Sequence, residues 1–314
     1  MKISLCVTVL NEEESIGKLL DSLLLQSKKA NEIIIVDGGS TDRTVEMIRH
    51  YQKKHSFIKL IVEKSSRSKA RNLAVDLAKS EIIAMTDAGC SALPDWLENL
   101  VKPFTTGKID VVAGFYKMVG TTNFQKAESV FMGVTPRKFN HSFLPSTRSI
   151  AFTKDIWERV GGFPENAEGT AEDTIFNLKL IKNGARISRM KNAVVEWGIP
   201  ASLFDFYLKI MNYAKGDAKS KNLIFPGKGL MSHNIKALSI YPRYILFILL
   251  LIFSLKSHIL LAYLIIIFFA YLLWAYRKVY LEFGDWKVAL WGPVLQIVSD
   301  FAVMKGFLSG IFVK

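Results

Sequence analysis

The sequence predicts an α/β fold, a doubly wound and mostly parallel sheet, followed by hydrophobic helices. In the first part of the chain, short apolar runs alternate with patterns of helical period, which is typical of a parallel sheet covered by helices. Polar residues directly follow several apolar runs, and the C-terminal quarter is far more hydrophobic. We therefore expect a globular domain over residues 1–200, a basic segment over 201–243 and membrane-associated helices over 244–314.

The alternation is clearest before Pro94. Runs rich in Ile, Val and Leu predict strands over 3–10, 32–37, 58–63 and 81–87. Amphipathic spacing predicts helices over 13–26 and 68–80, and a third that Ser40 or Thr41 caps and that continues through Tyr51. Ligands of such sheets bind beyond the carboxyl ends of the strands.

The pattern is looser after Pro94. We expect helices over 96–101, 124–134 and 171–184, strands over 110–116 and 148–152, and a loop over 135–145. Thr153 is expected to cap a short helix that ends at Gly161 and Gly162.

The formal net charge of +13 at pH 7 is concentrated beside the apolar C-terminal part. The bases between residues 205 and 243 are Lys209, Lys215, Lys219, Lys221, Lys228, Lys236 and Arg243. A cationic segment next to apolar helices favours an anionic membrane surface. Nucleic acid is not expected as a partner, because no aromatic-interleaved binding motif accompanies the charge. Cys6 and Cys90 lack disulfide or zinc spacing, which fits a reducing cytoplasm.

The apolar runs 244–255 and 259–276 predict a helical hairpin in the bilayer, although a buried hairpin in a soluble core is the alternative. Basic residues at both of its ends place those ends and the N-terminal domain in the cytoplasm. Residues 291–312 carry polar and small side chains close to one helical stripe, so they form a third membrane helix with that stripe facing protein or an interfacial helix.

Four polar clusters follow the predicted strands. Asn11 and Glu12 come after the first strand, Asp37 and two glycines after the second, and Asp87 after the fourth. The remaining cluster, third in chain order, is basic: Arg67, Lys69 and Arg71 precede or enter a helix at the same edge. Each cluster alone also fits a helix cap, a turn or a solvated face. Together they predict a pocket in which a carboxylate accepts from a base or ribose and cations meet a diphosphate.

Four stretches in succession resemble the ordered motifs of family 2 glycosyltransferases. They read VTVLNEEESIGKLLDSLLLQ, EIIIVDGGSTDRTVEMI, KARNLAVDLAKSEIIAMTDAGC and GGFPENAEGTAEDTIFNLKLIKNGARI. The resemblance implies a GT-A fold that binds a nucleotide-activated sugar and transfers the sugar with inversion at its anomeric carbon. Membrane-associated bacterial and archaeal members of the family are the most similar type.

The resemblance also implies where the donor binds. Leu10 and Glu12 would line the nucleoside, Asp37 would contact the base and Arg71 would reach the nucleotide. Asp87 matches the first Asp of the family's DxD motif, whose second position here is Gly. A divalent cation, Mg²⁺ or Mn²⁺, is implied as the cofactor, with Asp87 as its one protein carboxylate, since Mg²⁺ often needs only one or two carboxylates beside substrate phosphates.

The remaining site residues are implied for the acceptor side. Asp173 would be the general base that takes the proton of the acceptor hydroxyl, with Glu172 assisting it or contacting the acceptor. Arg148, Ser149 and Lys215 are candidates for contact with the acceptor or the leaving diphosphate.

The function expected from these features is transfer of a sugar from a nucleotide-diphosphate donor to a hydroxyl acceptor at the cytoplasmic membrane face. The membrane helices favour an acceptor that is lipid-linked or a glycan. Direct transfer to a polyprenyl phosphate is one alternative, because that acceptor is already ionised. A catalytically silent membrane scaffold that kept the fold is another.

Overall fold

A computed structural model of the chain describes residues 1–165, 172–219 and 233–312. By their internal contacts these residues form two compact units. The first comprises residues 1–118, 138–165 and 172–198. The second comprises residues 119–137, 199–219 and 233–312. The segment 119–137 therefore groups with the C-terminal helices, whereas the sequence pattern places it in the N-terminal domain.

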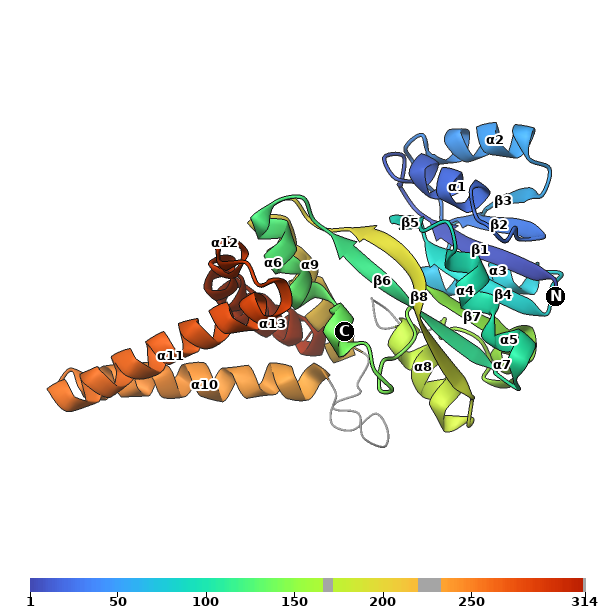
Figure 1. Ribbon diagram of the computed structural model, residues 1–314. Coiled ribbons are helices and arrows are strands. Elements are labelled where there is room, and N and C mark those ends of the chain that lie inside the picture. Colours follow the sequence, from blue (N-terminus) through green and yellow to red (C-terminus); the bar gives the residue numbers. More distant parts are fainter. Residues whose placement is uncertain (166–171, 220–232, 313–314) are drawn as a thin grey trace. The chain divides into compact units, whose positions relative to one another are not determined.

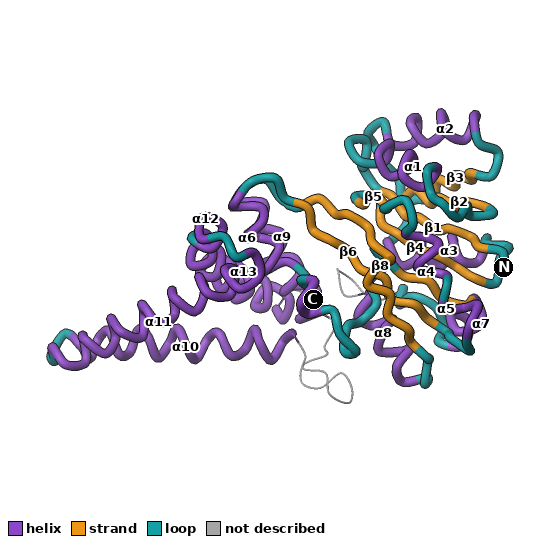
Figure 2. Tube along the Cα trace, in the orientation of Figure 1, coloured by secondary structure: helices purple, strands orange, loops and turns teal. Residues whose placement is uncertain are grey.

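The first unit is built on one eight-stranded sheet, drawn in orange in Figure 2, with strand order β3-β2-β1-β4-β7-β6-β8-β5. The strands are β1 (Ile3–Val9), β2 (Glu32–Asp37), β3 (Ile58–Val62), β4 (Ile82–Asp87), β5 (Cys90–Ala92), β6 (Val111–Val119), β7 (Ile150–Thr153) and β8 (Ile187–Gly198). Strands β1 to β4 pair in parallel, as expected. In the other half, β7 pairs antiparallel with β4 and with β6, and β5 pairs antiparallel with β8.

The helices of the first unit follow the expected alternation with few changes. They are α1 (Ile16–Leu24), α2 (Thr44–Lys54), α3 (Arg67–Asp76), α4 (Trp96–Val101), α5 (Pro103–Thr106), α7 (Lys154–Arg159) and α8 (Glu172–Lys182). Thr153 caps α7 through its side chain, as predicted. The prediction that Ser40 or Thr41 caps α2 is wrong, because the helix begins at Thr44. Both hydroxyls are used in the preceding loop instead.

The register of the parallel strands positions the site. Val9 at the end of β1 lies opposite Asp37 of β2, and Thr8 lies opposite Asp87 of β4. The interior residues of β1, β2 and β4 are almost entirely buried and apolar, so the strands are held between layers on both faces of the sheet. Asp37 and Asp87 therefore emerge at one edge, on either side of β1.

The second unit is helical. Its elements are α6 (Asn123–Met132), the 3-10 helix η1 (Pro136–Lys138), α9 (Leu203–Lys219), α10 (His233–Ser254), α11 (His258–Phe283), α12 (Trp286–Ala289) and α13 (Trp291–Phe312). Three segments are long and apolar enough to cross a membrane by length and composition, namely Ala237–Ser254, His258–Phe283 and Trp286–Phe312. Two bases of the predicted basic segment, Lys221 and Lys228, lie outside the described residues.

The expected helical hairpin is formed by α10 and α11, which run side by side in Figure 1. Ser257 caps α11 through its side chain, and Gly284 ends the helix in the left-handed conformation, with φ 65°. Most large side chains along the middle of both helices are exposed and apolar. Such a surface suits lipid rather than water.

The stripe of small and polar residues on α13 faces protein. Gly306 and Gly310 lie against the backbone of α9, and a Cβ at Gly310 would come within 2.5 Å of the Lys215 carbonyl oxygen. Gly292 approaches the backbone of α11 in the same way. Gly306 and Gly310 thus allow α9 and α13 to pack closely along their length.

Candidate functional site

The loop after β2 is folded around the carboxylate of Asp37. One oxygen, Oδ1, accepts from the amide nitrogens of Gly39 and Ser40 at 3.0 and 2.9 Å, and Oδ2 accepts from the Ser40 hydroxyl at 2.5 Å. Gly39 has φ 101°, a conformation that favours glycine. Because Asp37 is fully buried, its side chain fixes the loop that would receive a base.

The loop after β1 is tied to this same segment. Asn11, with φ 53°, donates its amide to the Ser40 hydroxyl at 2.8 Å, and its Oδ1 accepts from the Thr41 amide at 2.8 Å. The amide of Glu12 donates to the Thr44 hydroxyl at 2.8 Å. Leu10 at the start of the loop is 55% exposed although it is apolar. The two loops therefore form one connected rim that leaves the Leu10 side chain open to a ligand.

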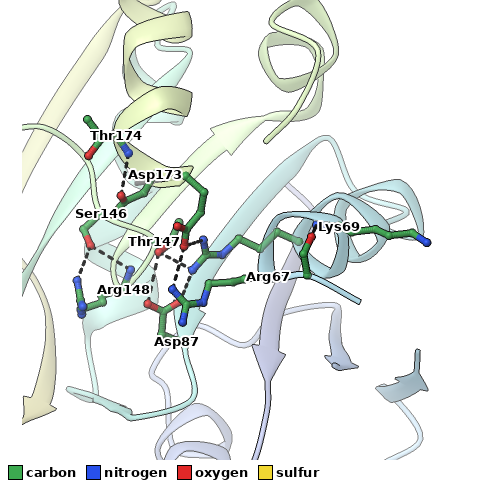
Figure 3. A network of polar contacts seen from close by, with 11 residues as sticks. Arg67, Lys69, Asp87, Ser146, Thr147, Arg148, Asp173 and Thr174 are labelled. Atoms are coloured by element: carbon green, nitrogen blue, oxygen red, sulfur yellow. Dashed lines mark hydrogen bonds and ion pairs between the residues drawn. The ribbon is translucent and has the colours of Figure 1, made fainter. Parts of the chain in front are cut away.

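At the other edge of the site, one buried guanidinium links three residues from different parts of the chain. Arg71 of α3 donates through Nη1 to Glu172 Oε1 at 2.8 Å and through Nη2 to Asp87 Oδ1 at 3.1 Å. The same Nη2 donates to the Thr147 hydroxyl at 2.9 Å. Arg67 from the preceding turn donates to the same oxygen of Glu172 at 3.1 Å. Figure 3 shows Arg67, Asp87 and Thr147 converging, whereas Lys69 on the same helix as Arg67 points away.

The surrounding arginines keep Asp87 ionised. Desolvation alone would raise the pKa of its carboxyl, but the positive charges of Arg71, Arg148 and Arg67 outweigh it and hold the pKa below the ordinary value. The Asp87 side chain remains 29% exposed, so it can still contact a ligand. The edge therefore presents one charged carboxylate among three guanidinium groups.

The two acidic residues at the start of α8 have different surroundings. Glu172 is buried and paired with Arg71 and Arg67. Asp173 is half-buried, and among the described residues its Oδ1 accepts a hydrogen bond from the amide of Thr174, at 2.7 Å. Desolvation and the negative charge of Glu172 raise the pKa of Asp173. Asp173 thus combines partial exposure with a raised pKa, which are properties of a general base.

Arg148 packs against two aromatic rings. Its guanidinium carbon lies 4.0 Å from the centroid of the Trp197 ring and 5.1 Å from that of Tyr116. Its Nη1 donates to the Ser146 hydroxyl at 3.3 Å. Gly89, at the second position of the expected DxD motif, lies against the same Trp197, because a Cβ there would be 3.7 Å from Nε1. Arg148 and Gly89 thus share Trp197 as a neighbour.

Two further candidates from the sequence are Ser149 and Lys215. The Ser149 hydroxyl is fully buried, accepts from Trp96 Nε1 at 2.8 Å and donates to the Ala193 carbonyl at 3.0 Å. It therefore serves the core of the first unit, and we do not propose it as an acceptor contact. Lys215 belongs to α9 of the second unit, where it is half-buried.

Thr147 is a site residue that the sequence pattern did not indicate. Its hydroxyl accepts from Arg71 and is 3.4 Å from Asp87 Oδ2. The polar run of residues 146–149 between Pro145 and the next apolar run was the available signal. It could not show which of these hydroxyls turns toward Arg71.

The carboxylates of this edge fit a divalent cation only in part. Among the described residues there is no group of three or more His, Cys, Asp or Glu side chains that could hold a metal ion. Asp87 offers one partly exposed carboxylate that already pairs with Arg71. This arrangement suits an ion ligated mainly by diphosphate oxygens and water.

The mixed sheet, the polar loops after β1, β2 and β4 and the C-terminal helices together have the architecture of a GT-A glycosyltransferase. The profile of the family described as "Glycosyl transferase family 2" matches residues 4–162. The chain belongs to this family, as its ordered motifs led us to expect.

One curated relative matches most of the chain. It is the dolichyl N-acetyl-alpha-D-glucosaminyl phosphate 3-beta-D-2,3-diacetamido-2,3-dideoxy-beta-D-glucuronosyltransferase of Methanococcus voltae, 28% identical over 235 residues, or 68% of this chain and 73% of the relative. Other relatives are covered less: the chain spans 56% of a glycosyltransferase of Haloferax volcanii that is 26% identical over 171 residues.

Two solved structures show the same fold. TarS of S. aureus in complex with UDP has a TM-score of 0.52 at 25% identity, covering 69% of this chain and 65% of that one. The mannosyltransferase PcManGT of Pyrobaculum calidifontis, solved with GDP-Man and Mn²⁺, has a TM-score of 0.58 at 20% identity and covers 96% of this chain and 86% of that one.

Proposed function

We propose that the chain transfers a sugar, with inversion, from a nucleotide-diphosphate donor to a hydroxyl of a lipid-linked acceptor at the cytoplasmic face of a membrane. The proposal rests mainly on the start of α8. There Glu172 forms ion pairs with Arg71 and Arg67, whereas Asp173 stays partly exposed and has a raised pKa. Family membership and the UDP bound to TarS support a nucleotide-diphosphate donor. The Methanococcus relative acts on a dolichyl-linked sugar by its name, and the membrane-type helices support a similar acceptor.

The donor would lie along the rim between β1, β2 and β4. Leu10 and the loop around Asp37 receive the nucleoside, with Glu12 beside them, and Asp87 orients the diphosphate together with Arg71. A divalent ion, Mg²⁺ or Mn²⁺, would be held by Asp87 and would supply positive charge to the leaving diphosphate. Arg148 supplies a fixed positive charge on the same edge, which stabilises developing negative charge during departure. Lys215 stays a prediction for the same role.

The acceptor hydroxyl would lose its proton to Asp173 as its oxygen attacks the anomeric carbon from the face opposite the diphosphate. One bond forms between the acceptor oxygen and the sugar, and the bond to the diphosphate breaks with the electron pair leaving on the diphosphate. Glu172 is a positioning residue in this scheme, because its carboxylate acts through Arg71.

Donor binding tests the proposal directly. Detergent-purified protein is titrated with uridine and guanosine diphosphate sugars, with and without Mg²⁺ or Mn²⁺, and compared with Asp87→Ala and with Asp76→Ala, which removes an exposed carboxylate of α3. We expect one nucleotide to bind, with loss of affinity in Asp87→Ala alone. Absence of binding to every donor would contradict the proposal and favour a silent scaffold. Binding that depends neither on the metal nor on Asp87 would indicate that the arginines, rather than Asp87, contact the diphosphate.

A further inference from the structure

The second unit contains an open apolar cavity of about 460 Å³ between α10 and α11, bordered by Ile297 of α13. Apolar side chains of both hairpin helices line it, among them Leu246, Leu250, Ile267 and Phe268. Its volume is within the range of small-molecule sites. Because the surrounding helices are long and apolar enough to cross a membrane, we expect such a cavity to bind a hydrocarbon chain.

Three residues that line the cavity, Arg243, Tyr244 and Tyr271, also hydrogen-bond to Asp300. Asp300 of α13 is buried, and its Oδ2 accepts from Arg243 Nη2 at 2.8 Å and from the Tyr244 hydroxyl at 3.1 Å. The Tyr271 hydroxyl donates to the same oxygen, and Gln296 donates to Oδ1 at 3.0 Å. An ionised pair within helices of membrane type is costly, so its presence there indicates a function rather than simple packing.

Arg243 is the cation of this network and also lines the cavity. Within the described part of the chain its guanidinium donates a hydrogen bond through Nη2, and its side chain is 42% exposed. The guanidinium also lies 5.1 Å from the centroid of the Tyr271 ring, which fixes its orientation. A guanidinium has five N–H donors, so Arg243 has donors beside the one bonded to Asp300 that an anion could use, and a guanidinium matches phosphate geometry especially well.

From the cavity and the cation that lines it we infer a binding site for a long-chain lipid phosphate, with the chain between α10 and α11 and the phosphate at Arg243. The inference rests on the proposed function, because the occupant to which it commits is the lipid of the acceptor. Asp300 acts as the residue that positions Arg243. The residues that line the site all belong to the second unit.

Matched tryptophan substitutions test the proposed site for the hydrocarbon chain of the lipid. Ile267 and Ile266 are neighbours on α11 with 53% and 62% exposure, but only Ile267 is among the residues that line the cavity. Leu246 and Ile245 on α10 form a second such pair, at 57% and 56%. We expect Ile267→Trp and Leu246→Trp to weaken binding of a polyprenyl phosphate about tenfold, since filling the cavity removes apolar contact. Ile266→Trp and Ile245→Trp should bind like the wild type.

The phosphate end is tested with a double variant, Arg243→Gln with Asp300→Asn, which removes both charges and leaves no buried ion unpaired. In nanodiscs of zwitterionic lipid, native mass spectrometry compares a polyprenyl phosphate with the polyprenyl alcohol of equal length. The wild type should prefer the phosphate, and the double variant should lose that preference. Equal affinity of all four tryptophan variants for the polyprenyl phosphate would overturn the cavity site. Complete displacement of the polyprenyl phosphate by an equal amount of an anionic diacyl phospholipid would overturn it as well. Wild-type transfer to a lipid-linked acceptor, measured in the same preparation, shows whether the proposed function stands when the cavity site fails.

Discussion

Arg71 and Glu172, 101 positions apart in sequence, form a buried ion pair at 2.8 Å, with side-chain exposures of 3% and 4%. The pair joins α3 to the start of α8. It also holds the guanidinium where its other nitrogen reaches Asp87. The position of the donor-side carboxylate is thereby coupled to the helix that carries Asp173.

Breaking this pair should cost stability. In Glu172→Ala the Arg71 charge loses its buried partner, and such a loss typically lowers the free energy of unfolding by about 3–5 kcal/mol. Glu172→Gln keeps an oxygen acceptor and should cost less. Thermal unfolding in detergent measures both. Lys69→Ala, which removes an exposed pair with Glu63, is the control and should change little. Equal midpoints for the wild type and Glu172→Ala would show that the pair does not hold the site together.

Asp173→Asn should separate chemistry from binding. Asparagine fills the same space but cannot take a proton, so turnover should fall by about 10²–10⁴-fold while the affinity for the donor is unchanged. Single-turnover rates and donor titration on one preparation measure the two effects. Wild-type turnover in the variant would remove Asp173 from the role of base and favour an acceptor that is already ionised, such as a polyprenyl phosphate.

The pH profile gives an independent test of Asp173. Its pKa is raised by desolvation and by the negative charge of Glu172, and it is active only when deprotonated. The acid limb of kcat/KM should therefore lie at higher pH than for an ordinary carboxyl group. Glu172→Gln removes that neighbouring charge and should move the limb to lower pH. A limb that does not move in this variant would mean that another group sets it.

Much of the fold and part of this site could be predicted from sequence, because strands and their ends have a local signature. The parallel strands place Asp37 and Asp87 beside the end of β1, as the apolar runs indicated. The antiparallel strands β5 and β8 were not predicted. One has only three residues, and the other begins with a partly exposed run that lacks an apolar signature.

The partners of Arg71 were not predictable for a different reason. Glu172 and Thr147 are 101 and 76 positions away, and no periodicity connects side chains at such separations. The grouping of segment 119–137 with the C-terminal helices is equally non-local. Family resemblance singled out Glu172 and Asp173 as candidates, but it did not show that Glu172 is paired with two arginines.

The close packing of α13 on α9 predicts sensitivity at Gly306. A Cβ there would collide with the Met211 carbonyl oxygen, and backbone cannot move aside as a flexible side chain can. Gly306→Ala should lower the thermal midpoint by more than Gly198→Ala, because a Cβ at Gly198 would meet nothing within 4 Å. Equal midpoints for the two variants would mean that the helices separate without cost.

The stability of the second unit should depend on pH through Glu128 of α6. This residue is fully buried, and desolvation raises its pKa to about 8, with Lys209 lowering it and Asp205 raising it. The folded pKa is above the unfolded value, so the stabilisation is complete below the unfolded pKa and is lost as the pH rises through about 8. The free energy of unfolding should fall by up to about 1.4 kcal/mol per pH unit in that window. Glu128→Gln, which stays neutral, should remove this part of the pH dependence. The difference between wild-type and variant thermal midpoints, measured from about pH 5 to pH 8, cancels the titration of other groups. A constant difference would show that Glu128 is ionised in the folded unit, and hence that Lys209 compensates the charge.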